Sequence, residues 1–253
     1  IGDFYFDDFK HNGATLQSYL KAYPVFGVQK KTKVDTSWYR DQFITEKIVD
    51  GYEWNLKLGP LENANKYYRN NFFFQQVLNH PNYDDFWKPR GLIQHLENVN
   101  HYVLTVGGLF DAEDLYGPLS IFKKLEETTN SSVRNMIVMG PWSHGNWARE
   151  KGKQLVNHIY FGDSISTWYQ KNVEREFFNS ILKKNGIPNL PKVQFFDTGL
   201  KEWRTFSEWP SKDFSRNRLY FKKSNQLVFN DKTDQKLKFK HLSDPMNPVP
   251  YRS

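Results

Sequence analysis

Two stretches of the chain share one pattern that strongly constrains its fold: an apolar run, then glycine, then one polar side chain on the following loop. Tyr102–Val106 leads to Asp111, and Met136–Val138 leads to His144, 33 residues further on. Short apolar runs bounded by glycine are typical of buried strands, and strands that alternate with helices predict a parallel sheet. Asp111 and His144 are therefore expected within hydrogen-bonding reach of each other at the carboxyl edge of one sheet.

The chain divides into three parts by pattern. Residues 1–95 are aromatic and polar, with helix signals and no strand alternation, and they predict an inserted helical cap. Residues 96–189 alternate strands and helices and predict an α/β core. Residues 190–253 contain short β-type runs separated by turn residues, and they predict the beginning of an all-β domain.

Four helices are expected from local signals: Ala14–Leu20 after Asn12 and Gly13, a segment capped by Thr36 and Ser37, one opened by Gly117 and Pro118, and Ile165–Lys184. The last has the longest apolar periodicity, and Asp163 or Ser164 can cap its start. The expected strands of the third part are Val193–Phe196, Arg218–Phe221 and Lys236–Lys240. Three such strands cannot bury two faces of a sandwich.

The composition excludes several classes of protein. The net charge of +7 invites a nucleic-acid interpretation, but the basic residues are spread in pairs with acids between them, which favours a solvated surface. No apolar run reaches the length of a membrane span. The 253 residues contain no cysteine, which rules out disulfides, cysteine zinc sites and a thiol nucleophile.

Several motifs, in collinear order, resemble the serine hydrolases that include α-amino-acid ester hydrolases, glutaryl-7-aminocephalosporanic acid acylases, cocaine esterase and X-Pro dipeptidyl-peptidases. The matching segments are Asp7–Ala14, His80–Trp87, Gly108–Asp114, Met139–His144, and the residues Thr198, Gly199, Trp203, Trp209 and Pro210. The resemblance implies the C-terminal part of an α/β-hydrolase fold with an inserted helical cap, followed by the start of a jelly roll. It also implies a periplasmic or secreted bacterial protein.

The resemblance implies Asp111 as the triad acid and His144 as the general base. In the amino-acid ester hydrolase branch a carboxylate cluster binds the α-ammonium of the substrate, and Asp84 and Asp85 are the candidates here, with Asp84 the better match. A solvated turn or a helix N-cap is the alternative role for Asp84. For Asp111 the alternative is a helix cap, with Glu113 and Asp114 as competing acids.

The nucleophile is missing from this pattern. No serine has the Gly-x-Ser-x-Gly setting of a nucleophile elbow, and Ser143 adjoins the histidine with Trp142 before it. The chain is therefore expected to be a piece of a longer enzyme whose serine and oxyanion-hole tyrosine precede Ile1. By itself it is expected to be inactive.

The favoured function is cleavage of ester or amide bonds in a small molecule or short peptide, in the manner of an α-amino-acid ester hydrolase or glutaryl acylase. The alternatives are an X-Pro dipeptidyl-peptidase and a non-catalytic module that binds peptides or amides. We expect no cofactor, no nucleic acid and no membrane partner. A cation at Asp111, Glu113 and Asp114 is disfavoured because no further ligands have a recognised spacing. Exposed edges of partial sheets predict a possible homo-oligomer.

Overall fold

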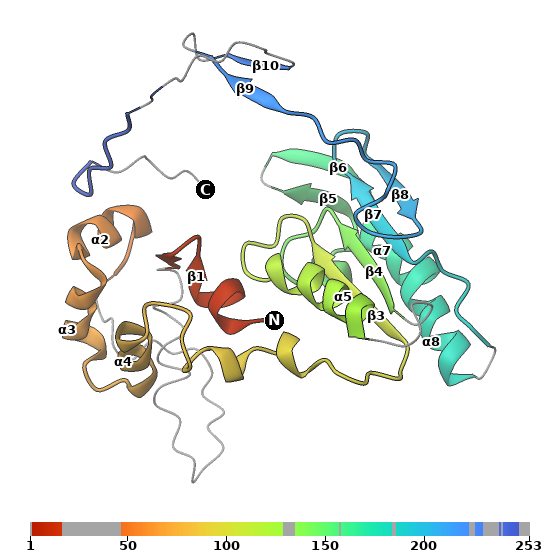
Figure 1. Cartoon of the computed structure of the whole chain (residues 1–253), viewed down its shortest axis with the longest axis horizontal. Helices are drawn as coiled ribbons and strands as arrows, with labels where there is room; N and C mark the ends of the chain where they lie inside the picture. The colour runs from red at the N-terminus through yellow and green to blue at the C-terminus, as the bar shows by residue number, and fades with distance from the viewer. Residues whose placement is uncertain are drawn as a thin grey trace. The chain divides into compact units, whose positions relative to one another are not determined.

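A computed structural model describes residues 2–16, 47–128, 135–156, 158–183, 186–222, 226–229, 238 and 240–247 (Figure 1). By contacts the chain divides into two units, Ile1–Phe206 and Ser207–Ser253, each of which we describe by itself. Within the described residues, no helix is both long enough and apolar enough to cross a bilayer.

The first unit begins with a π-helical turn and a hairpin: η1 (Tyr5–Phe9), β1 (Lys10–His11) and β2 (Ala14–Thr15). The expected helix from Ala14 is wrong at its start, because Ala14 and Thr15 pair antiparallel with β1. Asn12 and Gly13 adopt φ of 50° and 83°. Two positive φ values in an Asn-Gly pair form the turn that joins two antiparallel strands, so this pair predicts a hairpin. Residues 17–20 of that helix, and the one expected after Thr36, lie outside the described residues.

A helical region follows: α2 (Gly51–Leu58), η3 (Leu61–Ala64), α3 (Asn65–Tyr68), α4 (Phe72–Asn79), η4 (Lys88–Arg90) and η5 (Ile93–His95). Side-chain caps start two of these helices, since Asp50 accepts from Glu53 N at 3.0 Å and Asn71 accepts from Phe74 N at 2.9 Å. Four of these helices, α2, η3, α3 and α4, share a core with η1 and with Trp87. The buried residues of this core are Tyr5, Phe9, Leu58, Ala64, Tyr68, Phe74, Val77 and Trp87. The core therefore attaches η1 to the helical region.

The second part of the unit contains a four-stranded sheet of order β3-β4-β7-β8 (Figure 1). Its strands are β3 (Val103–Gly108), β4 (Asn135–Gly140), β7 (Val193–Asp197) and β8 (Glu202–Phe206). β3, β4 and β7 are parallel and β8 is antiparallel, so the predicted parallel sheet is confirmed. Helix α5 (Tyr116–Thr128) connects β3 to β4 and lies on the face of Met139, whereas Val138 points to the opposite face.

The remaining elements are α6 (Asn146–Arg149), the hairpin β5 (Lys153–Val156) and β6 (Ile159–Asp163), and then α7 (Ile165–Tyr169), η7 (Gln170–Glu174) and α8 (Arg175–Leu182). The helix predicted from Ile165 is thus present, with a π-helical turn in its middle. Ser164 precedes it but makes no side-chain capping hydrogen bond. Ile165, Tyr169 and Val173 pack with Val138 on the face of the sheet opposite α5.

The expected start of the β domain needs a correction. Val193–Phe196 does not open a separate domain, because β7 pairs in parallel with β4 and β8 pairs with β7. The division between the units falls after Phe206. In the second unit β9 (Leu219–Phe221) and β10 (Leu227–Phe229) form an antiparallel pair. Most of the strand expected at 236–240 lies outside the described residues.

Candidate active site

The loops after β3 and β4 lie against each other because the two strands are parallel and in register. Gly108 pairs with Gly140 at their carboxyl ends. A Cβ at Gly108 would lie 2.2 Å from the carbonyl oxygen of Trp142, so only glycine permits this approach. Phe110 N then donates to Trp142 O at 3.0 Å. Trp142 is fully buried, so the second loop is anchored in the core immediately before His144.

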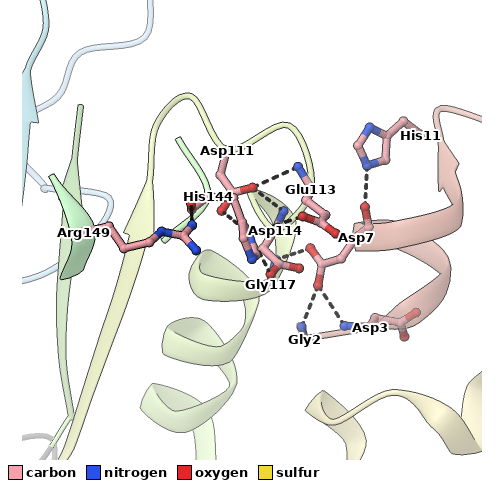
Figure 2. Close-up of polar contacts among 10 residues, drawn as sticks. All are labelled: Gly2, Asp3, Asp7, His11, Asp111, Glu113, Asp114, Gly117, His144 and Arg149. Carbon is pink, nitrogen blue, oxygen red and sulfur yellow. Dashed lines mark hydrogen bonds and ion pairs between the residues drawn. The ribbon is translucent and has the colours of Figure 1, made fainter. Parts of the chain in front are cut away.

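The loops bring the predicted pair together: His144 Nδ1 lies 3.1 Å from Asp111 Oδ2 (Figure 2). The Asp111 side chain is 1% exposed and the His144 side chain 51%. Asp111 Oδ1 accepts from Glu113 N at 2.9 Å and Asp114 N at 3.0 Å. Both amides lie in the loop before α5, so this contact closes a turn and does not cap the helix. An aspartate that accepts from Nδ1 leaves Nε2 as the proton acceptor of the ring. Arg149 donates to the backbone oxygen of His144 and holds the loop.

Two more carboxylates flank the imidazole. Glu113 Oε2 lies 3.4 Å and Asp114 Oδ2 3.5 Å from His144 Nδ1. Asp111, Glu113 and His144 each bring one ligand atom within 4.8 Å of the others, a spacing at which three groups can share a cation. The Asp111–His144 hydrogen bond already uses two of these atoms, and we assign no metal here.

A further acid, Asp8 in η1, interacts electrostatically with this group. Asp8 is 3% exposed, and burial, followed by the charges of Asp114, Glu113 and Asp7, raises its pKa to about 7. Burial also raises the pKa of Asp114, and the charges of Asp7 and Asp111 add to the effect. We call Asp8, Glu113 and Asp114 the carboxylate cluster. Like charges held together in a desolvated place favour a bound cation or proton.

Comparison with known proteins identifies the family. Residues 1–146, more than half of the chain, match the sequence profile described as X-Pro dipeptidyl-peptidase (S15 family). The chain belongs to the S15 family. The matched residues include the carboxylate cluster, Asp111 and His144.

Three similar proteins bear on the S15 assignment. Cocaine esterase of Rhodococcus sp. (strain MB1 Bresler) is 26% identical over 147 residues, which cover 57% of this chain and 24% of the esterase. The crystal structure of an aminopeptidase from the marine sediment archaeon Thaumarchaeota archaeon matches with a TM-score of 0.82 and 27% identity, over 100% of this chain and 40% of its own. An α-amino acid ester hydrolase matches with a TM-score of 0.82 and 21% identity, over 99% and 41%.

These neighbours establish the α/β-hydrolase fold, which confirms that part of the predicted architecture. The chain spans about a quarter of the length of the esterase and about two fifths of the length of the two solved structures.

Asp84 and Asp85, the other two predicted site residues of this S15 chain, contact residues other than Asp111 and His144. Asp84 Oδ2 lies 2.8 Å from His80 Nδ1, and Asp84 Oδ1 accepts from Phe86 N at 3.0 Å. The His80 contact, with the amide of Phe86, lowers the pKa of Asp84. Asp85 is 99% exposed and pairs with Lys88 at 3.1 Å. Among the contacts of the described residues, none joins Asp84 or Asp85 to Asp111 or His144.

Sequence reasoning missed Asp8 as a site residue. Its signal was present, since two adjacent acids, Asp7 and Asp8, stand in a motif that resembles the family. Glu113 and Asp114 were considered only as rivals of Asp111 or as cation ligands. The hydrogen bond from Gly117 to Asp7 packs η1 against the start of α5 (Figure 2), and this packing lets Asp8 interact electrostatically with Glu113 and Asp114.

Proposed function

We propose that this chain is part of a serine hydrolase that cleaves ester or amide bonds next to a free α-amino group. The observation that carries the proposal is the carboxylate cluster beside the Asp111–His144 pair. Membership of the S15 family supports the hydrolase class. The aminopeptidase at 27% identity supports an α-amino substrate, since an aminopeptidase acts on a residue with a free amino group.

His144 and Asp111 would work as the base and acid of a Ser-Asp-His triad. His144 Nε2 takes the proton of the serine hydroxyl as the oxygen attacks the acyl carbon, and then gives it to the leaving group. Asp111, fixed by two backbone amides, holds the Nδ1–H tautomer and stabilises the imidazolium. We also propose that the helices in residues 47–95 and η1 form the cap of the hydrolase fold. η1 matters for the site because it carries Asp8.

The cluster would bind the substrate ammonium. Its members Glu113 and Asp114 lie within 3.5 Å of the imidazole, so a cation held there stays beside the base. An ammonium 4 Å from a carboxylate gains about 4 kcal/mol at the effective dielectric of a protein site. A single carbon atom separates an α-ammonium group from the acyl carbon. A substrate whose ammonium group is bound by the cluster would therefore have its acyl carbon near the His144 imidazole. An anionic glutaryl group would be repelled, so the ester hydrolase branch is favoured over the acylase branch.

The test measures hydrolysis of two esters by the full-length gene product at pH 7.5. Phenylalanine methyl ester has the α-amino group, and 3-phenylpropionic acid methyl ester is the same molecule without it. We expect kcat/KM to favour the amino ester. Asp8→Asn should raise KM for the amino ester about 10- to 100-fold, as loss of a buried charge partner does, and leave the second ester unaffected. His144→Ala should stop turnover of both. Equal KM effects of Asp8→Asn on the two esters would contradict the ammonium site.

Asp84→Asn serves as the matched comparison, because Asp84 was the earlier candidate for the same role. We expect a smaller KM effect than for Asp8→Asn, since His80 and Phe86 N already occupy the Asp84 oxygens. A larger effect would return the ammonium site to Asp84.

X-Pro dipeptidyl-peptidase activity is the second candidate, favoured by the matched family profile. Such a peptidase also recognises a free amino group, but one residue further from the scissile bond. Hydrolysis of an aminoacyl-proline anilide faster than of a single aminoacyl anilide would select this activity.

A further inference from the structure

Asp7, the neighbour of Asp8, is fully buried and accepts hydrogen bonds from three backbone amides (Figure 2). Oδ2 accepts from Gly2 N at 2.6 Å and from Asp3 N at 3.0 Å. Oδ1 accepts from Gly117 N at 2.7 Å. One carboxylate therefore joins the start of the chain to a helix 110 residues away in sequence.

The bond to Gly117 lies in the first turn of α5, where backbone N–H groups lack partners within the helix. A negative charge at this end is also favoured by the helix dipole. The two segments approach so closely that a Cβ at Gly117 would lie 2.6 Å from Gly2 N, and one at Gly2 would lie 2.7 Å from Gly117 Cα. Backbone contact of this kind fixes the spacing of the segments.

This link runs through the residues that carry the carboxylate cluster. Asp8 follows Asp7 directly, and Gly117 comes three residues after Asp114. The carbonyl oxygen of Asp7 is 2.8 Å from His11 Nε2, so the backbone of Asp7 is held from a second side. The backbone that carries Asp8 is thus held beside the start of α5 by the side chain and backbone of Asp7.

We propose that Asp7 is a positioning residue that tunes the site for α-amino substrates by tying η1, which carries Asp8, to the first turn of α5, just after Glu113 and Asp114 in the chain. It acts through Asp8 and not by touching the substrate. The inference rests on the proposed function, since selectivity for an ammonium group is the property that Asp7 would set. A purely structural Asp7 would lower the amount of folded enzyme and leave the ratio of kcat/KM for the two esters unchanged.

The experiment measures that ratio in Asp7→Asn. The amide keeps one acceptor oxygen but turns an NH2 group toward backbone donors, so the two segments should separate at this point. We expect the amino-to-desamino ratio to fall about 10- to 100-fold, as displacement of a binding group by about 1 Å can cause. The loss should lie in KM for the amino ester, with kcat of the desamino ester unchanged.

Asp3→Asn is the matched control. Asp3 is also buried and lies in the same turn, but its side chain accepts from Tyr5 N at 2.9 Å and from Tyr83 Oη at 2.8 Å, not from α5. We expect its ratio to equal that of the wild type. Asp7→Glu keeps the charge with one more methylene, and if Asp7→Asn does not fold, a fall of the ratio in Asp7→Glu carries the test.

Amide hydrogen exchange gives a readout besides activity. Protection at Gly117 should be lost in Asp7→Asn and kept in Asp3→Asn. If that protection is lost while the ratio stays at the wild-type value, Asp7 is structural and the inference is overturned, although the proposed function stands. If the wild type has a ratio near one, or Asp8→Asn leaves the ratio unchanged, the proposed function fails and the inference fails with it.

Discussion

Asp8 shows how burial and like charges act together on one side chain. Its raised pKa, about 7, means that the native state holds the proton more tightly than the unfolded chain does. The contribution of Asp8 to stability is therefore fully present below the unfolded pKa of 3.8 and is lost as the pH rises toward 7. Because the acids of the cluster interact, the transition belongs to the group and not to Asp8 alone.

We predict that, between pH 5 and pH 8, the unfolding free energy of Asp8→Asn rises by about 1 to 2 kcal/mol relative to that of the wild type, after allowance for screening. Urea unfolding at both pH values measures this. Asp84→Asn is the control, because the pKa of Asp84 is lowered from 3.8 and its stabilisation is already complete above that value, so its effect should be the same at pH 5 and pH 8. A wild-type stability that rises from pH 5 to pH 8 as steeply as that of Asp8→Asn would contradict the burial of an ionisable Asp8.

Asp111→Asn should lower kcat about 10,000-fold with little change in KM, because the amide favours the wrong histidine tautomer. Steady-state kinetics on the full-length gene product at saturating ester measures this. Glu113 and Asp114 lie 3.4 and 3.5 Å from the same ring nitrogen. A loss of less than about tenfold would mean that one of them replaces Asp111 as the partner of His144.

At the scale of elements, the start of α5 depends on a glycine. Gly117→Ala would put a Cβ 2.6 Å from Gly2 N and 2.7 Å from Asp7 Oδ2, so backbone must shift. We predict a loss of about 1 to 3 kcal/mol, measured by chemical unfolding. Gly51→Ala in the first turn of α2 meets nothing within 4 Å and should be neutral or stabilising. Equal effects of the two substitutions would show that the Gly2–Gly117 contact is not made.

The elements that sequence predicted well are those with a long apolar signal. β3, β4, α5 and the helix from Ile165 have apolar residues at strand or helix spacing, and burial enforces that spacing. The hairpin at Asn12 and Gly13 replaces the start of the predicted helix, because the turn that this pair specifies outweighs the helical spacing of the apolar residues after it. The π-helical turn at Gln170–Glu174 has no local sequence signal that we can name.

At the scale of the whole molecule, contacts distant in sequence decide what the sequence alone could not. Asp111 and His144 follow adjacent strands, so their meeting could be predicted from strand order. Asp8 lies in a different region of the chain, and its electrostatic interaction with Glu113 and Asp114 depends on the packing of η1 against α5. In the same way β7 has the composition of a strand in either domain, and only its pairing with β4 shows which sheet it joins.

The pairing of β7 with β4 gives a test between the two candidate domain boundaries, the predicted one after Asn189 and the one after Phe206. A chain that ends at Phe206 keeps all four strands, whereas one that ends at Asn189 loses β7 and β8 and with them the buried side chains of Val193 and Phe196. Burial of each such side chain contributes about 1.5 to 3 kcal/mol, and removal of β7 also leaves backbone groups of β4 unpaired. The shorter chain therefore loses an unfolding free energy that approaches the total stability of a typical domain, about 5 to 15 kcal/mol. We predict that the chain ending at Phe206 retains a cooperative thermal transition in near-ultraviolet circular dichroism, and that the shorter chain shows none. A cooperative transition in the chain ending at Asn189 would mean that β7 is not part of the core sheet.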